Sequence, residues 1–109
     1  MRAALHDLYI EQSVALEEYF QWLDSSGDPH DLTEAAYAGD LKYSKDRSDI
    51  IISLTLTTIS ASLGVFRVSI SSDDTAGLDF NSAVYTIYIT LSGGTMKRVV
   101  EGNAYLSKA

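Results

Sequence analysis

The sequence predicts an all-β fold, an antiparallel two-sheet β-sandwich of about seven strands. Seven tyrosines, one tryptophan and seven glycines accompany many Thr, Ser, Ile and Val residues, a composition that favours strands over helices. Short apolar runs with a period of two are separated by turn signals, and no long helical pattern recurs between them. At 109 residues, the chain is expected to form a single domain over residues 1–109.

Charge and composition exclude several classes of function. Fifteen acidic and eight basic side chains give a net charge of −7, which repels nucleic-acid phosphates and anionic lipid. We therefore expect no nucleic-acid partner and no membrane partner. The chain has no cysteine, which excludes disulfides and thiolate metal sites. It shows no signal peptide and no apolar run of membrane-spanning length, so we expect a soluble, unprocessed and complete gene product.

The first segment, residues 5–23, fits either strands or a helix. Its apolar residues follow a helical three-and-four spacing almost as well as a strand alternation. We favour strands at 5–11 and 16–24, and the helix stays the alternative. The strand interpretation turns Glu18 inward unless a bulge or an edge position intervenes.

A turn cluster and a third strand follow. Residues 24–31 contain the only proline together with glycine and aspartates, which stop either kind of element. Alternation resumes at 35–43, with Tyr37 and Tyr43 on one face. Residues 44–49 are predicted to form a charged loop.

Two apolar stretches come next. Residues 50–56 predict one covered strand, because a run so apolar and β-branched invites intermolecular pairing if it is left open. A turn at 60–64 leads into a strand at 65–70, with Arg67 facing outward. The core side of that strand consists of Phe66, Val68 and Ile70.

The last third of the chain predicts a helical turn and a hairpin. Residues 71–78 have the composition of a single helical turn before the penultimate strand. Strands at 84–91 and 96–106 flank a turn at Gly93-Gly94, because glycine reaches the positive φ of a tight reversal without steric cost. One face of the first of these strands consists of Tyr85, Ile87, Ile89 and Leu91.

The two histidines are the only candidates for the base of a nucleophile system. His6 stands beside Asp7 and His30 beside Asp31, but the chain has no Gly-x-Ser-x-Gly elbow. We interpret both pairs as exposed polar residues, one near a terminus and one in a turn. The prediction is therefore that the chain is not an enzyme and has no catalytic residues.

Acidic residues in the turn cluster leave one metal site as an alternative. Asp24, Asp28 and Asp31 could supply oxygen ligands to Ca²⁺, although their spacing does not match an EF-hand loop. Aspartates also satisfy turn backbones by themselves, so we predict no metal and no cofactor. Asp73-Asp74 is interpreted as a helix cap instead of a carboxylate pair for acid–base chemistry.

The remaining candidates have structural interpretations. Gly93-Gly94 lies between two strands, which removes a phosphate-cradling role. Lys97-Arg98 is interpreted as solvation of a strand face. Phe20 and Trp22 are predicted to be core aromatics, because a sugar-stacking platform needs rings that are exposed and side by side.

Four motifs over nearly the whole chain agree with one known pattern. The first is an aromatic strand followed by Gly-x-Pro-x-Asp-Leu-Thr at residues 27–33. The others are Gly-Val-Phe-Arg-Val-Ser-Ile at 64–70, Asp-Thr-Ala-Gly-Leu at 74–78, and Gly-Thr-Met-Lys-Arg-Val-Val-Glu-Gly at 94–102. With them the chain resembles a family of small immunoglobulin-like structural proteins of tailed bacteriophages. Its first half is similar to the N-terminal domain of the upper baseplate protein of some siphophages.

The resemblance implies an immunoglobulin-like sandwich and a virion component of the tail, baseplate or neck, assembled in the host cytoplasm. It implies other virion proteins as partners, in multiple copies within a symmetric assembly, and no catalytic residues. The chain departs from the family at Ser13 and Glu34, where members usually carry glycine, and at Thr86, where aspartate is common.

Two other classes of function stay open. A glycan-binding or adhesive β-sandwich module could use exposed rings such as Trp22, Tyr37 or Tyr43. A small enzyme would need a pocket with convergent polar groups. For the virion component, sheet edges and loop faces are the expected docking surfaces, because edges present unpaired backbone groups.

Overall fold

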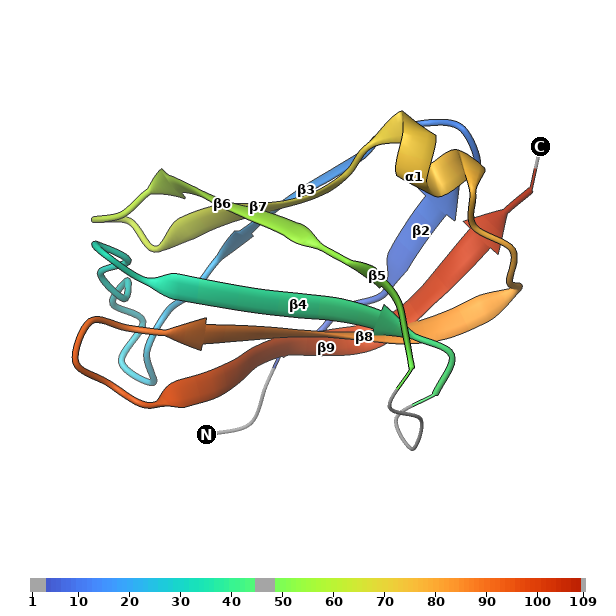
Figure 1. Cartoon of the computed structure of the whole chain (residues 1–109). Coiled ribbons are helices and arrows are strands. Elements are labelled where there is room, and N and C mark those ends of the chain that lie inside the picture. Colours follow the sequence, from blue (N-terminus) through green and yellow to red (C-terminus); the bar gives the residue numbers. More distant parts are fainter. Residues whose placement is uncertain (1–3, 45–48, 109) are drawn as a thin grey trace.

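Two β-sheets pack face to face in this chain (Figure 1), of which the computed structural model describes residues 4–44 and 49–108. Within these residues the larger sheet contains β1 (Ala4–Leu5), β2 (Leu8–Glu11), β4 (Ala36–Lys42), β5 (Ile50–Ser53), β8 (Ser82–Thr90) and β9 (Met96–Ser107). Its strand order is β1-β9-β8-β4-β5, and β2 also pairs with β9. The smaller sheet contains β3 (Leu16–Gln21), β7 (Val65–Ile70) and β6 (Thr55–Ser60), in that order.

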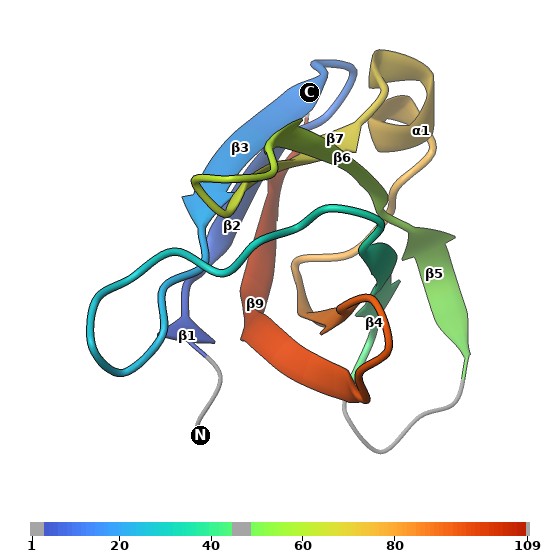
Figure 2. The same ribbon diagram turned by 90° about the vertical axis from the view of Figure 1, so that its left-hand side faces the viewer.

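This strand order is that of an immunoglobulin-like sandwich. β3, β7 and β6 occupy the places of strands B, E and D, and β9, β8 and β4 occupy those of G, F and C. β5 extends the second sheet as strand C′ does in variable-type domains. Seen end-on in Figure 2, β5 lies on one side of the sandwich and β1 on the other. The predicted fold class is confirmed.

Alternate side chains from both sheets fill the space between them. The predicted inner faces of β7 and β8 are buried, and Tyr37 on the inner face of β4 is half-buried while Tyr43 is exposed. Burial of these apolar side chains is the main favourable term in folding, since the chain has no disulfide. The largest fully buried side chains are Tyr85, Phe66, Leu8, Ile10, Leu32, Leu41, Ile87, Ile89, Val68 and Thr75.

The N-terminal segment forms strands, and the helical alternative is wrong. The predicted strand at 5–11 is nevertheless interrupted at His6 and Asp7, and its two halves, β1 and β2, both pair in parallel with β9. At the interruption the backbone N–H of His6 donates to the carbonyl of Glu101 (3.0 Å). The Asp7 carboxylate accepts the backbone N–H of Asn103 (3.0 Å). This side chain therefore replaces the backbone acceptor that a continuous β-ladder would supply.

The apolar run at 50–56 is divided between the two sheets, so the prediction of one covered strand is wrong. β5 pairs with β4 in the larger sheet, and β6 pairs with β7 in the smaller one. Leu54 between them is buried, and its N–H donates to the carbonyl of Gly39 (2.8 Å). Ile50 is exposed because β5 is an edge strand. Of the loop predicted before it, residues 45–48 lie outside the described part of the chain.

The predicted helical turn is α1 (Ser72–Ala76), which closes one end of the sandwich between β7 and β8 (Figure 1). Its N-cap is Ser71, whose hydroxyl accepts the N–H of Asp74 (3.2 Å). Asp73 and Asp74 lie in the first turn, where a negative carboxylate interacts favourably with the positive end of the helix dipole. The prediction that this pair caps the helix is therefore wrong in detail, because the shorter Ser71 side chain takes the cap position.

The predicted C-terminal hairpin is confirmed. β8 and β9 are antiparallel, with Thr90 opposite Met96 next to the turn. Gly93 has a φ of 70°, and the N–H of Gly94 donates to the carbonyl of Leu91 (2.9 Å). Glycine at the first of these positions supplies the left-handed backbone that the reversal requires.

Two residues other than glycine hold a left-handed backbone within residues 4–44 and 49–108. Ser13 has a φ of 70° and Glu34 a φ of 58°. A side chain at positive φ costs about 1–2 kcal/mol, because Cβ crowds the following carbonyl.

Replacing either residue by glycine is expected to stabilise the chain. Ser13→Gly and Glu34→Gly should each raise the free energy of unfolding by about 0.5–1 kcal/mol, since relief of the strain exceeds the added chain entropy of glycine. Urea unfolding measures this gain. Ser25→Gly is the control, because Ser25 has no positive φ and should lose stability. Losses of the same size in all three variants would contradict the prediction.

Candidate functional site

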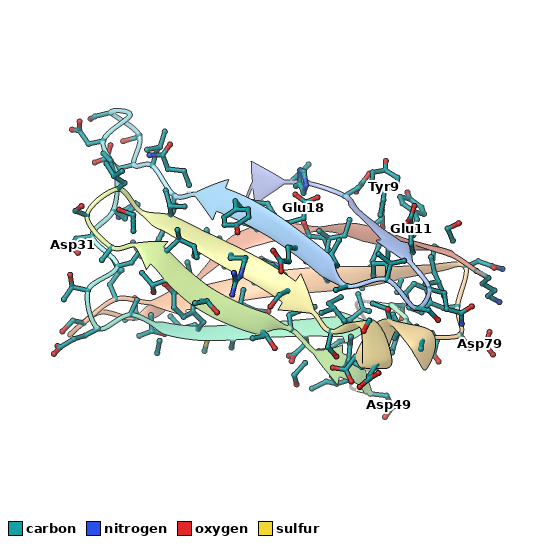
Figure 3. All side chains as sticks on the ribbon, turned by 90° about the horizontal axis from the view of Figure 1, so that it is seen from above. Tyr9, Glu11, Glu18, Asp31, Asp49 and Asp79 are labelled. Carbon is teal, nitrogen blue, oxygen red and sulfur yellow. The ribbon has the colours of Figure 1, made fainter. Side chains whose placement is uncertain are left out.

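An exposed tyrosine pair lies where β2 runs beside β9. The parallel pairing aligns Tyr9 with Tyr105, and their ring centroids are 5.5 Å apart with an angle of 25° between the planes. Tyr9 is 68% exposed and Tyr105 38%. Because Leu8 and Ile10 point into the core, Tyr9 and Glu11 point outward (Figure 3). The result is an aromatic stack in contact with solvent.

A hollow of about 500 Å³ adjoins this tyrosine pair. Its apolar lining includes Val14, Leu16 and Leu106, and its polar lining includes Glu11 and Ser107. Such a hollow can accept a ligand that has both an apolar part and a polar end.

Contacts with α1 position the turn that forms one wall of the hollow. The buried Thr75 hydroxyl donates to the carbonyl of Val14 (3.0 Å), and the Gln12 side-chain amide donates to the carbonyl of Leu78 (3.0 Å). The turn between β2 and β3 is thereby held against the helix.

His6 lies at the break between β1 and β2. Its ring packs edge-on against Phe20 (centroids 5.1 Å apart), and its Nε2 lies 3.7 Å from Oε1 of Glu18. Asp7 bonds to the backbone of β9, as described above. Glu18 points inward as predicted, and it is tolerated because β3 is an edge strand where its side chain is one-third exposed.

His30 is half-buried, so the prediction of an exposed turn residue is wrong. Its ring stacks on Trp22 with centroids 3.9 Å apart, and the backbone N–H of His30 donates to the Trp22 backbone carbonyl (3.0 Å). Trp22 is only 7% exposed, which confirms that it is a core aromatic and excludes its ring as a sugar platform. The bridge between Leu23 and Pro29 folds the turn back onto the indole, and this long-range closure cannot be read from local composition.

Two of the three carboxylates considered for calcium, those of Asp24 and Asp31, accept hydrogen bonds within their own turn. Asp24 Oδ1 accepts the N–H of Ser26 (2.8 Å) and of Asp28 (3.0 Å). Asp31 Oδ1 accepts the hydroxyl of Thr33 (2.7 Å) and its N–H (2.9 Å). Both hydrogen bonds lower the pKa of the Asp31 carboxyl, and the one from the Thr33 hydroxyl has the larger effect. In the described ranges, no group of three or more His, Cys, Asp or Glu side chains could hold a metal ion.

The other predicted surface residues lie apart from the tyrosine pair. Arg98 forms an ion pair with Glu101 (3.1 Å) on β9. The hydroxyl of Tyr37 is hydrogen-bonded to Thr58, and Tyr43 is exposed beyond the end of β4. None of the rings suggested for glycan binding belongs to the exposed stack of Tyr9 and Tyr105, which the sequence pattern did not predict. The alternation of Leu8 to Glu11 could have placed Tyr9 outward, but its partner depends on a parallel pairing that local sequence does not encode.

Tyr85 links β8 to the N-terminal segment inside the sandwich. It is fully buried on β8, and its hydroxyl donates to the carbonyl of His6. Burial raises its pKa above the ordinary value of 10.0, and the charges of Asp7 and Glu18 add to this rise.

Tyr85→Phe should lower the free energy of unfolding by about 1–3 kcal/mol at neutral pH, because the His6 carbonyl loses its partner. The stabilisation is complete below pH 10.0 and is lost as the pH rises above it, because the unfolded state then releases the tyrosine proton first. The stability gap between wild type and Tyr85→Phe should therefore narrow above pH 10.0. Urea titrations across neutral and alkaline pH measure the gap, and a gap independent of pH would contradict this account.

Comparison with known proteins adds little to the fold. No protein-family model matches the chain, and no curated protein matches it. One similar solved structure comes from a photo-crosslinking study of multimeric cell-adhesive interactions of VGSC beta subunits. It is 9% identical, with 96% of this chain and 92% of that chain covered and a TM-score of 0.43. A likeness of this size carries no argument about function, and the fold assignment rests on strand order and register.

The fold and the surface together define an immunoglobulin-like sandwich with an exposed aromatic stack and, beside it, a hollow with both apolar and polar lining. No helix in residues 4–44 and 49–108 has the length and apolar character needed to cross a membrane.

Proposed function

We propose that the chain is a non-enzymatic structural module of a bacteriophage virion, in the tail, baseplate or neck. In this proposal it acts through contacts with other virion proteins, and it is present in multiple copies in a symmetric assembly. The observation that carries the proposal is the backbone at Ser13 and Glu34, since both are left-handed at the positions where the resembled family has glycine.

Glycines in the motifs that carry the resemblance also lie where the backbone requires glycine. Gly27 and Gly64 have φ values of 87° and 68°. Gly102 allows the His6 backbone to approach so closely that a Cβ would lie 2.1 Å from its carbonyl oxygen. Motif residues with such backbone requirements support the resemblance, and the proposed virion role rests on that resemblance.

Sheet edges give this module a physical means of docking. Within the described chain, β5 pairs on one side only, as do β3 and β6. An edge strand presents free N–H and C=O groups, to which a strand of a neighbouring subunit can add.

The test is the composition of phage particles encoded alongside this gene. Mass spectrometry of gradient-purified particles should detect the chain at a fixed ratio to known tail proteins, and cryo-electron microscopy should locate it. Its absence from particles whose other small virion proteins are detected would refute the proposal.

An adhesive module is the second candidate, and the exposed stack of Tyr9 and Tyr105 is the observation that favours it. Exposed aromatic residues are enriched at binding surfaces, because they combine a large apolar area with a polar tip. Binding of the purified chain to host cells, lost on Tyr9→Ala, would support this candidate.

A further inference from the structure

We propose that the stack of Tyr9 and Tyr105, together with Glu11, binds an arginine or lysine side chain presented by a partner protein. This inference deepens the proposed function, because it names the docking surface and the chemistry of the partner. It rests on the proposed function only for the source of that partner.

The geometry of the rings favours a cation. Tyr9 and Tyr105 stack on each other at 5.5 Å and 25°, so they leave the outer face of a ring open to solvent. A guanidinium or ammonium group over such a face is attracted by the negative charge of the ring face. Arginine can also stack its planar group on the ring. A sugar platform would instead need rings laid next to each other with coplanar open faces.

Glu11 adds an anionic partner on the same side of β2. It lies two residues from Tyr9, so the two side chains leave the strand about 7 Å apart. That spacing allows one long basic side chain to contact the ring and the carboxylate together. Ser107, directly opposite Glu11 in the register, offers a hydroxyl beside it.

The adjoining hollow suits the aliphatic part of the same side chain. Val14, Leu16 and Leu106 provide apolar lining, and Glu11 and Ser107 lie among the lining residues. Lysine and arginine bury their methylene stems on apolar surface while the charged end keeps its polar partners. The turn that carries Val14 is anchored to α1, so the wall is already in place before binding.

The charge of the molecule favours the same ligand. The chain has a net charge of −7. At the end of the sandwich where Tyr9 and Glu11 lie (Figure 3), Asp79 is paired with Lys108 (3.0 Å), so the overall charge of the chain and Glu11 are what favour a basic ligand. The resulting field attracts a basic segment and does nothing for a neutral sugar.

The experiment titrates the full chain, labelled with ¹⁵N, with an acetylated and amidated tetra-arginine peptide. Tetraserine and maltotetraose are titrated in parallel. The amides of Tyr9, Glu11, Tyr105 and Ser107 should shift with tetra-arginine and not with tetraserine or maltotetraose. Affinity should fall about tenfold for Tyr9→Leu, which keeps apolar bulk but removes the ring, and about threefold or more for Glu11→Gln.

Matched controls lie on the opposite sheet. Tyr19 is 56% exposed on β3, and Glu17 on the same strand is exposed as well. Tyr19→Leu and Glu17→Gln should leave the affinity within about twofold of wild type. If the control variants lost as much affinity for tetra-arginine as the site variants, binding would come from general charge attraction without a site, and the proposal would be overturned. Binding of maltotetraose in place of the peptide, or of neither probe, would overturn it too.

Failure of this inference is distinguishable from failure of the proposed function. Phage that encode Tyr9→Leu should incorporate less of the chain into particles if the stack docks it there. Wild-type incorporation of Tyr9→Leu would overturn the docking role of this surface while leaving the virion assignment intact.

Discussion

Gly102→Ala is expected to lower the free energy of unfolding by about 3 kcal/mol or more. The added Cβ would lie 2.1 Å from the carbonyl oxygen of His6 and 2.8 Å from its carbonyl carbon. Both are backbone atoms, so the segment between β1 and β2 would have to leave β9. The hydrogen bonds of His6 to Glu101 and to Tyr85 would be lost with it. Urea unfolding followed by circular dichroism measures the loss.

Gly77→Ala is the matched control for this substitution. At Gly77 the nearest atom to a new Cβ is 3.7 Å away and φ is −84°, so alanine fits without displacement. Its stability should stay within about 0.5 kcal/mol of wild type. Hydrogen exchange in Gly102→Ala should accelerate in β1 and β2 before β6 and β7. Equal stability of the two variants would mean that the close approach at His6 is not required.

Gly64→Ala should have the second largest effect, about 3 kcal/mol, because two causes combine. The new Cβ would lie 2.7 Å from the carbonyl oxygen of Trp22 and 2.9 Å from that of His30, and φ is 68°. Relief of the clash would separate Trp22 from His30, which now stack at 3.9 Å. Tryptophan emission should therefore shift to longer wavelength as water reaches the indole, in addition to the loss in urea unfolding.

Gly93→Ala separates the two causes. Gly93 has nearly the same φ, 70°, but no atom lies within 4 Å of the position of a new Cβ. Its cost should be the left-handed strain alone, about 1–2 kcal/mol. The amount by which Gly64→Ala loses more stability than Gly93→Ala then measures the clash with Trp22 and His30. If both variants lose the same stability, the contact contributes nothing.

The virion proposal and the peptide experiment address different properties of the chain. The backbone at Ser13, Glu34, Gly64 and Gly102 concerns the path of the chain, on which the virion proposal rests. The stack of Tyr9 on Tyr105 concerns one patch of surface that any partner could use. A stable glycine variant that still binds tetra-arginine would show that the two properties are independent.

Local patterns predicted the elements that local physics determines. The alternation around Phe66 and Tyr85 identified buried faces, because a strand exposes its two faces with a period of two. The turn at Gly93 and the helix after Ser71 were predicted because glycine at positive φ and a hydroxyl cap act within a few residues.

Predictions failed where two distant segments meet. The strand at 5–11 looked continuous, and its break at His6 depends on Gly102 in the last strand. The run at 50–56 looked like one strand, and its division at Leu54 follows from the need to cross between sheets. His30 looked exposed until the turn folded back onto Trp22.

By itself, the sequence determined the strands at 65–70 and 84–91, their core faces and the turn at Gly93-Gly94, since these follow from backbone sterics and hydrophobic periodicity. Only the tertiary structure decided that β2 runs parallel to β9, and so brought Tyr9 beside Tyr105 and Glu11 beside Ser107. The reason is physical: a strand's edge groups can pair with any other strand, and the choice is made by the packing of the whole core.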